Sequence, residues 1–280
     1  MTKSIYDVWK SYETYLHSHG IERHLAEQML QEVLAFTFTE WTLNLHEPFP
    51  KEKEEELEQF ARRLMNGEPF QYIVQRAHFY GRTFYVDPRV LIPRPETEEM
   101  VEFTLNWLNE RGKKDARIVD IGTGSGIIAI TLQLECPTLH VEATDVSSDA
   151  LEVAQKNAEA LIAPVTFTDG DGTNALSGTY DVIISNPPYI AQSERPVMSE
   201  SAILHEPHLA LFAEEEGLAF YRHLAETAHF YVTNGSLLVV EIGYAQKDAV
   251  CDMFQRAWPE AVVKGHRDIY ERDRWITVQF

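Results

Sequence analysis

The chain has 280 residues, of which 44% are hydrophobic and 24% charged, and it lacks the ~20-residue apolar run that a membrane span needs. Its formal net charge of −20 disfavours nucleic acid as the direct substrate, because binding to phosphates normally requires a basic face. The 2 cysteines, Cys136 and Cys251, are neither clustered nor spaced as metal ligands, so we expect free thiols in a reducing cytoplasm and no metal site.

Apolar residues recur at three- and four-residue steps in the first part of the chain, which predicts amphipathic helices. Three such sets are Ile5, Val8, Trp9, Tyr12, Tyr15 and Leu16; Leu25, Met29, Leu30, Val33 and Leu34; and Leu57, Phe60, Ala61, Leu64 and Met65. Gly67 is the expected end of the third helix. Residues 1–68 are therefore predicted to form a small N-terminal helical domain.

Short β-like runs follow this region, at residues 72–74, 79–80 and 84–86. Gly81 and the pair Asp87-Pro88 separate them as turns, so residues 69–93 are expected to form a β-hairpin linker. A helix should begin directly afterwards, with Pro95 near its first turn.

Beyond residue 114 strand-like and helix-like segments alternate, which is typical of a doubly wound α/β sheet. The expected strands cover residues 117–121, 140–145, 165–168, 180–185, 236–242, 261–264 and 275–280, and the expected helices about 125–135, 148–160, 215–232 and 246–257. The last two strands leave no room for a helix between them. We therefore predict that residues 94–280 form a mostly parallel sheet with one antiparallel strand.

The first of these strands runs into a glycine turn that consists of Gly122, Thr123, Gly124, Ser125 and Gly126. Glycines allow a ligand to approach the backbone closely. A dinucleotide-binding turn would have its third glycine at Ile127, and a phosphate-binding loop would contain a lysine. Asp120, two residues before the turn, suits a ligand with an ammonium group; the alternative is a tight strand–helix turn without a ligand.

Acidic residues also follow the next two strands. Asp145 stands where a carboxylate can accept both hydroxyls of a ribose, because ligands of such folds lie beyond the strand ends. Its alternative role is a helix N-cap, which Ser147 or Ser148 could fill instead. Asp171, followed by Gly172, could accept a hydrogen bond from an adenine amino group, or could belong to an ordinary turn. Together these positions predict a cofactor that contains adenosine.

The strand at residues 181–185 ends in four residues that carry the chemistry, namely Asn186, Pro187, Pro188 and Tyr189. Proline restricts both itself and the preceding residue, so this segment is rigid. The Asn186 side-chain oxygen and the Pro187 carbonyl can accept both hydrogens of a planar NH₂ group, and Tyr189 can pack on its plane. Accepting these hydrogens favours the charge that develops on nitrogen during methyl transfer.

The order of these motifs resembles the class I S-adenosylmethionine-dependent methyltransferases, and nearly the whole chain, except for a loosely similar tail at residues 267–280, is similar to the release factor glutamine N5-methyltransferases (HemK/PrmC family). The resemblance rests on residues 67–72, 91–98, 120–126, 186–190, 206–207 and 210–211. It implies that residues 122–126 and Asp145 bind the cofactor and that residues 186–189 hold the substrate glutamine. It also implies a bacterial peptide-chain release factor as the protein partner, methylated at the glutamine of its Gly-Gly-Gln loop and docked by the N-terminal helices.

Three alternatives remain at the level of the sequence. An adenine N6-methyltransferase uses the same tetrapeptide, but it would need a basic groove to bind a flipped base. A methyltransferase acting on a glutamine of a ribosomal protein would use the same chemistry. A cofactor-binding module without catalysis would not need the intact segment at residues 186–189. Where Gly172 stands, some members of the family have a bulky aromatic residue, so stacking of this loop on the cofactor is open, whereas the role of the Asp171 carboxylate is kept.

Overall fold

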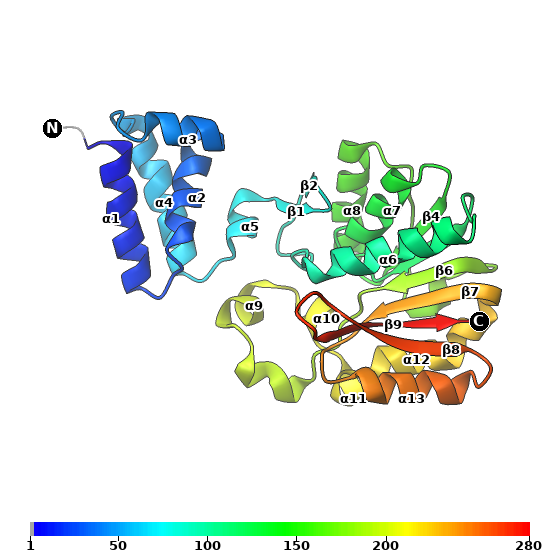
Figure 1. Cartoon of the computed structure of the whole chain (residues 1–280). Coiled ribbons are helices and arrows are strands. Elements are labelled where there is room, and N and C mark those ends of the chain that lie inside the picture. The colour runs from blue at the N-terminus through cyan, green and yellow to red at the C-terminus, as the bar shows by residue number, and fades with distance from the viewer. Residues whose placement is uncertain (1–2) are drawn as a thin grey trace. The chain divides into compact units, whose positions relative to one another are not determined.

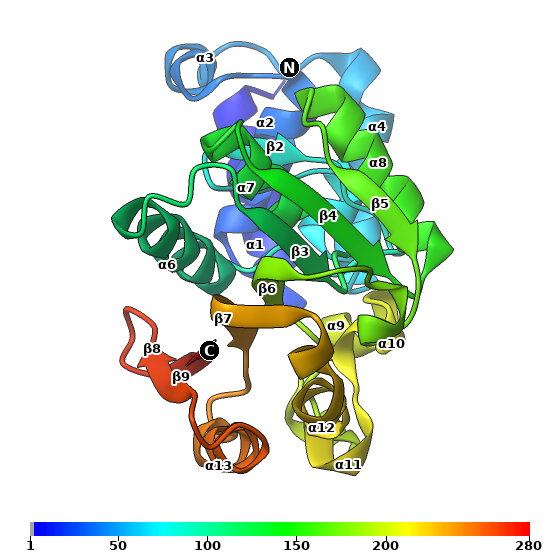
Figure 2. The ribbon, with the colours of Figure 1, turned by 90° about the vertical axis from the view of Figure 1, so that its right-hand side faces the viewer.

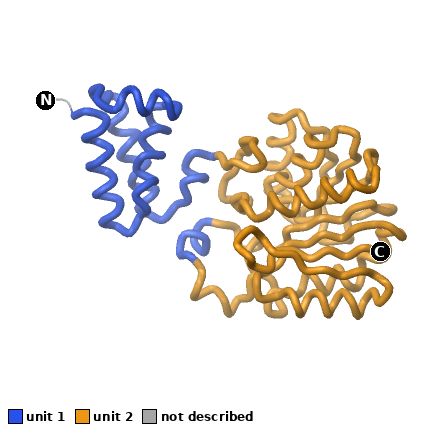
Figure 3. The backbone as a smooth tube through the Cα atoms, in the orientation of Figure 1, with its two compact units in different colours: residues 1–75, 199–205 blue, residues 76–198, 206–280 orange. Residues whose placement is uncertain are grey.

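The computed structural model describes residues 3–280, which divide into two compact units (Figures 1 and 3). Of the described residues, unit 1 comprises 3–75 and 199–205, and unit 2 comprises 76–198 and 206–280. Within the described residues no helix is long and apolar enough to cross a membrane.

Unit 1 is built from helices. They are α1 (Ile5–Ser18), α2 (His24–Leu34), α3 (Phe38–Asn44), the 3-10 turn η1 (Lys51–Lys53), α4 (Glu54–Met65), α5 (Phe70–Val74) and α9 (Glu200–His205). The three amphipathic sets predicted from the sequence share one core, with Leu16, Leu30 and Leu64 fully or almost fully buried. Gly67 ends α4 as predicted, with φ of +78° and its N–H donating to the Leu64 carbonyl.

The expected β-like run at residues 72–74 is wrong, because these residues belong to α5. Pro69 precedes the helix in an extended conformation and Gln75 ends it with φ of +54°. An apolar run this short fits either structure by periodicity alone. The hairpin itself is present, with β1 (Ala77–Phe79) antiparallel to β2 (Arg82–Phe84).

Unit 2 contains a seven-stranded sheet in the order β5-β4-β3-β6-β7-β9-β8. The strands are β3 (Arg117–Ile121), β4 (His140–Asp145), β5 (Thr166–Asp169), β6 (Tyr180–Ser185), β7 (Val232–Glu241), β8 (Val262–Arg267) and β9 (Asp273–Gln279). Only β9 runs against its neighbours, as the sequence predicts. The helices and 3-10 turns are α6 (Glu96–Glu110), α7 (Ile127–Glu135), α8 (Ser148–Leu161), η2 (Gly172–Ala175), η3 (Gln192–Val197), α10 (His208–Leu211), α11 (Glu214–Gly217), α12 (Ala219–Thr227), η4 (Ala228–Phe230) and α13 (Lys247–Ala257).

Helices cover both faces of this sheet, with α6, α7 and α8 on one face and α12 and α13 on the other (Figures 1 and 2). Successive residues of one strand consequently enter different cores. Val182 and Ile184 pack under the first set of helices, whereas Ile183 packs under the second. Apolar strands buried on both faces explain why the central strands read as continuous hydrophobic runs.

The single helix expected at residues 215–232 is wrong, since the chain forms α11, α12 and η4 there. Glu215 and Glu216 have positive φ, and Gly217 has φ of +83°. A Cβ atom on Gly217 would lie 2.2 Å from the Tyr189 carbonyl oxygen, so the backbone approaches a neighbouring loop too closely for any side chain. The break therefore serves the packing of the loop that follows β6.

Candidate active site

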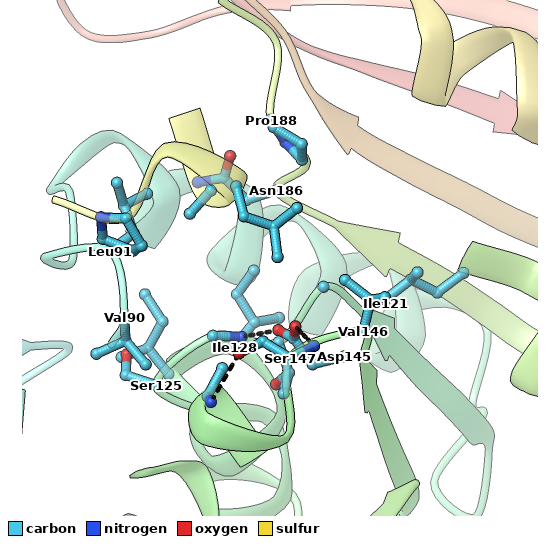
Figure 4. Close-up of a pocket in the computed structure, with 18 of the residues that line it drawn as sticks. Val90, Leu91, Ile121, Ser125, Ile128, Asp145, Val146, Ser147, Asn186 and Pro188 are labelled. Atoms are coloured by element: carbon cyan, nitrogen blue, oxygen red, sulfur yellow. Dashed lines mark hydrogen bonds between the residues drawn. The ribbon is translucent and has the colours of Figure 1, made fainter. Parts of the chain in front are cut away.

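A pocket opens at the carboxyl edge of the sheet, where the strand order reverses between β3 and β6. Ligands of open α/β sheets bind at such switch points because loops diverge there. Several segments line it: residues 89–94, the loops after β3, β4 and β6, residues 170–172, and Pro207, Leu209, Ala210 and Phe220. Figure 4 shows Asn186 and Pro188 on one side of the pocket and Ser125, Asp145 and Ser147 on the other.

The glycine turn supplies an open cradle on the floor of the pocket. Gly122 has φ of +73° and Gly124 has φ of +55°, conformations that other residues adopt at a cost. A Cβ atom on either would meet no atom within 4 Å, so the space above the backbone is free. Gly126 has another function, because its Cβ would lie 2.8 Å from Ile130 Cδ1 and 3.2 Å from Ala154 Cβ. Because glycine has no Cβ atom, α7 and α8 can pack closely here.

Asp120 lies beneath this turn, fully buried, and does not line the pocket. Its Oδ2 accepts hydrogen bonds from Thr123 Oγ1 at 2.6 Å and from the Ala129 N–H at 3.3 Å. Its Oδ1 has no hydrogen-bond partner although it is buried. Burial raises the pKa of Asp120 to about 7, since few dipoles compensate the charge. An unpartnered buried acceptor of this kind suits a cationic ligand.

Asp145 reaches into the pocket from the end of β4. Its Oδ2 accepts from the Gly124 N–H at 2.8 Å and its Oδ1 accepts from the Ser147 N–H at 2.9 Å. The N-cap of α8 is Ser147, whose hydroxyl accepts from the Ala150 N–H at 3.2 Å. Asp145 is therefore not needed as a cap, and each of its oxygens keeps a lone pair for a ligand. Burial raises the pKa of Asp145 above its usual value.

Asp171 and Gly172 form the third part of the floor, after β5. Gly172 has φ of +54°, and a Cβ atom there would lie 2.7 Å from His223 Nε2. The same histidine nitrogen contacts Thr173 Oγ1 at 2.9 Å. An aromatic residue cannot occupy position 172 in this packing. Phe220, on α12, instead brings an aromatic ring to the pocket wall.

The segment after β6 divides into two parts. Asn186 and Pro188 line the pocket, whereas Pro187 is buried and lies, with Tyr189, outside the lining. The Asn186 Nδ2 donates to Thr97 Oγ1 at 3.1 Å, which leaves its side-chain oxygen for another donor. Tyr189 directs its hydroxyl to Glu241 Oε1 at 3.4 Å, and burial raises the Tyr189 pKa. Gln246 Nε2 donates to the Tyr189 carbonyl at 2.9 Å and fixes the loop.

Residues 89–94 and Phe220 also line the pocket, although no motif in the sequence indicates a role for them. An ion pair holds this wall: Arg94 Nη2 donates to Glu206 Oε1 at 2.6 Å, and Glu206 Oε2 accepts from the Ile92 N–H at 3.2 Å. Glu206 is buried, so the pair braces residues 89–94 against the segment at Pro207. Arg94 and Glu206 are 112 residues apart, so hydrophobic periodicity could not reveal their ion pair. Both residues nevertheless belong to segments that carry the resemblance to the family.

The pocket residues fit S-adenosylmethionine chemically. The free cradle above Gly122 and Gly124 admits a ligand at the backbone, Asp145 presents a carboxylate, and the unpartnered Asp120 Oδ1 lies beneath. These groups match a ligand with hydroxyls and positive charge rather than a polyphosphate. Within residues 3–280 there is no group of three or more His, Cys, Asp or Glu side chains that could hold a metal ion.

Comparisons with known proteins agree with these features. A family model described as PrmC N-terminal domain matches residues 7–74, and one described as methyltransferase small domain matches residues 101–216. The release factor glutamine methyltransferase of Staphylococcus aureus is 39% identical, over 93% of this chain and 94% of its own. That of Bacillus subtilis is 39% identical over 98% and 97%, and that of Lactococcus lactis 42% identical over 85% and 87%.

Solved structures share the fold at low sequence identity. A methyltransferase from Pyrococcus furiosus superimposes with a TM-score of 0.53 at 18% identity, covering 79% of this chain and 97% of that one. The hMettl16 catalytic domain, in complex with an RNA hairpin, gives a TM-score of 0.56 at 18% identity, covering 72% and 76%. At this identity the likeness shows the fold alone.

Proposed function

The chain belongs to the release factor glutamine methyltransferase family, and from this we propose that it transfers a methyl group from S-adenosylmethionine to the side-chain amide nitrogen of the Gly-Gly-Gln glutamine in a peptide-chain release factor. The observation that carries the proposal is the position of Asn186. It lines the pocket across from the glycine turn and Asp145 (Figure 4), with its side-chain nitrogen hydrogen-bonded to Thr97.

The cofactor-binding roles follow from the pocket. Residues 122–126 would hold the methionine part against the backbone, and Asp120 would favour its ammonium group by charge. Asp145 would accept the two ribose hydroxyls, and Asp171 with Gly172 would border the adenine. When bound, S-adenosylmethionine would supply an electrophilic methyl group to this pocket, which Asn186 lines.

The residues after β6 would orient the substrate. An amide nitrogen is a poor nucleophile because its lone pair is delocalised into the carbonyl. The Asn186 Oδ1 and the Pro187 carbonyl would accept its two hydrogens and favour the positive charge that develops on nitrogen. Pro188 and Tyr189 would fix this edge, Pro188 at the pocket and Tyr189 through its bond to Glu241. The proton that nitrogen loses is acidic after transfer, so solvent can accept it and no general base is required.

The protein partner is a release factor rather than a nucleic acid in this proposal, and the net charge of −20 supports that choice. The N-terminal helical domain expected at residues 1–68 would dock the partner, and the domain expected at residues 94–280 would carry out the chemistry. Phe38 and Leu43 of α3 are exposed, which supports a contact surface there.

The experiment is methyl transfer from labelled S-adenosylmethionine to a purified bacterial release factor. We expect label in the wild-type factor and none in the factor whose Gly-Gly-Gln glutamine is replaced by glutamate. Incubation with ribosomal proteins and with DNA under the same conditions tests the two rival acceptors. Label in either of these, and none in the release factor, would overturn the proposed substrate.

A further inference from the structure

A buried chain of hydrogen bonds stands behind Asn186. Its Nδ2 donates to Thr97 Oγ1 at 3.1 Å, and Thr97 Oγ1 donates to Glu241 Oε2 at 2.7 Å. Thr97 is 0% exposed and Glu241 is 1% exposed, so water does not compete for these partners. The three residues come from the loop after β6, the first turn of α6 and the end of β7. This series of hydrogen bonds therefore connects three elements of the fold to the Asn186 side chain.

The direction of each hydrogen bond follows from what the groups can donate. An ionised carboxylate only accepts, so the one hydroxyl hydrogen of Thr97 must point to Glu241. Thr97 Oγ1 then has only lone pairs left for its other neighbour. It can accept from the Asn186 NH₂ group but would repel the Asn186 oxygen. The side-chain amide is thereby fixed with Oδ1 away from Thr97, where a substrate N–H can reach it.

The surroundings of Glu241 hold its carboxylate in place. Tyr189 donates to its Oε1 at 3.4 Å, and the Tyr221 hydroxyl donates to its backbone carbonyl at 2.7 Å. The charged groups that face it are Arg274 on β9, which favours the ionised form, and Glu96 on α6, which opposes it. Burial outweighs the favourable contacts and raises the pKa of Glu241 to about 7.

We propose that Thr97 and Glu241 are positioning residues for the methylation, in that the Glu241 carboxylate fixes the Thr97 hydroxyl and Thr97 in turn fixes the Asn186 amide with its oxygen toward the substrate nitrogen. This inference rests on the proposed function, because it assigns Asn186 the acceptor role there. Neither residue lines the pocket. Their contribution is to exclude the flipped amide, which would direct an NH₂ group at the substrate NH₂.

A dependence on pH follows from the same geometry. A protonated Glu241 can donate its own hydrogen to Thr97, and the Thr97 hydrogen is then free to turn toward Asn186. The amide loses its preferred orientation. We expect kcat to fall as pH drops through about 7, the pKa of Glu241. Glu241→Gln keeps an oxygen that can accept from Thr97 but has no proton to gain, so its kcat should lack this acid limb.

The test compares Thr97→Val, which keeps the branched shape without the hydroxyl, with Thr97→Ser, which keeps the hydroxyl. We expect Thr97→Val to lower kcat about tenfold to hundredfold, as a misplaced reacting group does, with KM for the release factor and the calorimetric Kd for S-adenosylmethionine changed less than about threefold. Thr97→Ser should keep kcat within about threefold of wild type. An equal fall in kcat in both variants, or a rise in KM or Kd in place of a fall in kcat, would overturn the inference.

A measurement without turnover separates this inference from the proposed function. The side-chain NH₂ signal of Asn186 in a ¹⁵N spectrum, assigned by its loss in Asn186→Asp, should move in Thr97→Val and stay in Thr97→Ser. A signal that stays in both variants would refute the positioning role, whichever acceptor is methylated. Wild-type protein that labels no release factor would count against the proposed function alone. Should Thr97→Val fail to fold, the pH profile of Glu241→Gln decides.

Discussion

Replacing Asp120 by asparagine should make the cofactor-free protein more stable and bind S-adenosylmethionine more weakly. Burial raises the Asp120 pKa from 3.8 to about 7. The folded protein consequently holds this proton more tightly than the unfolded chain does. Its contribution to stability is present below pH 4 and is lost as pH rises through about 7. At about 1.4 kcal/mol per pKa unit, the ionised carboxylate costs ~4 kcal/mol above pH 7.

Asparagine has nearly the same shape and removes this charge. Its side-chain oxygen can still accept from Thr123 and Ala129, as Oδ2 does now. Its NH₂ group would replace the unpartnered Oδ1 and remain without an acceptor, at a cost of about 1–3 kcal/mol. We therefore expect a net gain of about 1–3 kcal/mol in the free energy of unfolding at pH 8, and no gain at pH 4.

The assay combines urea unfolding at pH 4 and pH 8 with calorimetric titration of two ligands. Loss of the negative charge beneath the ammonium group is worth about 1.5–3 kcal/mol, so the Kd for S-adenosylmethionine should rise about tenfold to hundredfold in Asp120→Asn. The Kd for methylthioadenosine, which has no ammonium group, should not change. A variant that is less stable at pH 8, or that loses both ligands equally, would refute this account of Asp120.

Three other substitutions test the remaining parts of the site, and a fourth, at Ser236, is a control away from it. Asp145→Ala should raise the calorimetric Kd for S-adenosylmethionine and for methylthioadenosine by the same factor, about tenfold to hundredfold, because both ligands carry the ribose. Ser236→Ala also removes an acceptor of one backbone N–H and a buried bond to the Tyr180 carbonyl, but at the opposite end of the sheet; it should cost about 1–3 kcal/mol of stability in urea without changing either Kd. Asn186→Ala should abolish methylation of the release factor and leave the Kd for S-adenosylmethionine within about threefold; a large rise in that Kd would contradict the substrate-holding role. Gly172→Ala should lose about 1–2 kcal/mol of stability from its positive φ and its clash with His223, and equal stability to wild type in a melting experiment would contradict the packing described.

Much of unit 2 could be predicted from the sequence because its strands are long, apolar and separated by helices. The carboxyl ends of parallel strands meet at one edge, so Asp145 and Asn186 could be assigned to the same pocket from their places in the chain. The turn at residues 122–126 was equally readable, since its glycines stand where β3 meets a helix.

Short or non-local features could not be predicted. The run at α5 is too short for its periodicity to distinguish helix from strand. The break before α12 depends on the close approach of Gly217 to the Tyr189 carbonyl, a contact that only the fold creates. The bond between Thr97 and Glu241 joins residues 144 apart in the chain, and no motif connects them.

The substrate is the central claim, and one labelling experiment tests it most directly. The purified protein is incubated with S-adenosylmethionine carrying a labelled methyl group and a bacterial release factor, and the labelled peptide is identified by mass spectrometry. The account predicts one added methyl group on the glutamine of the Gly-Gly-Gln loop, and no label when that glutamine is glutamate. Label that persists in the glutamate variant, or that lies on another residue, would contradict it.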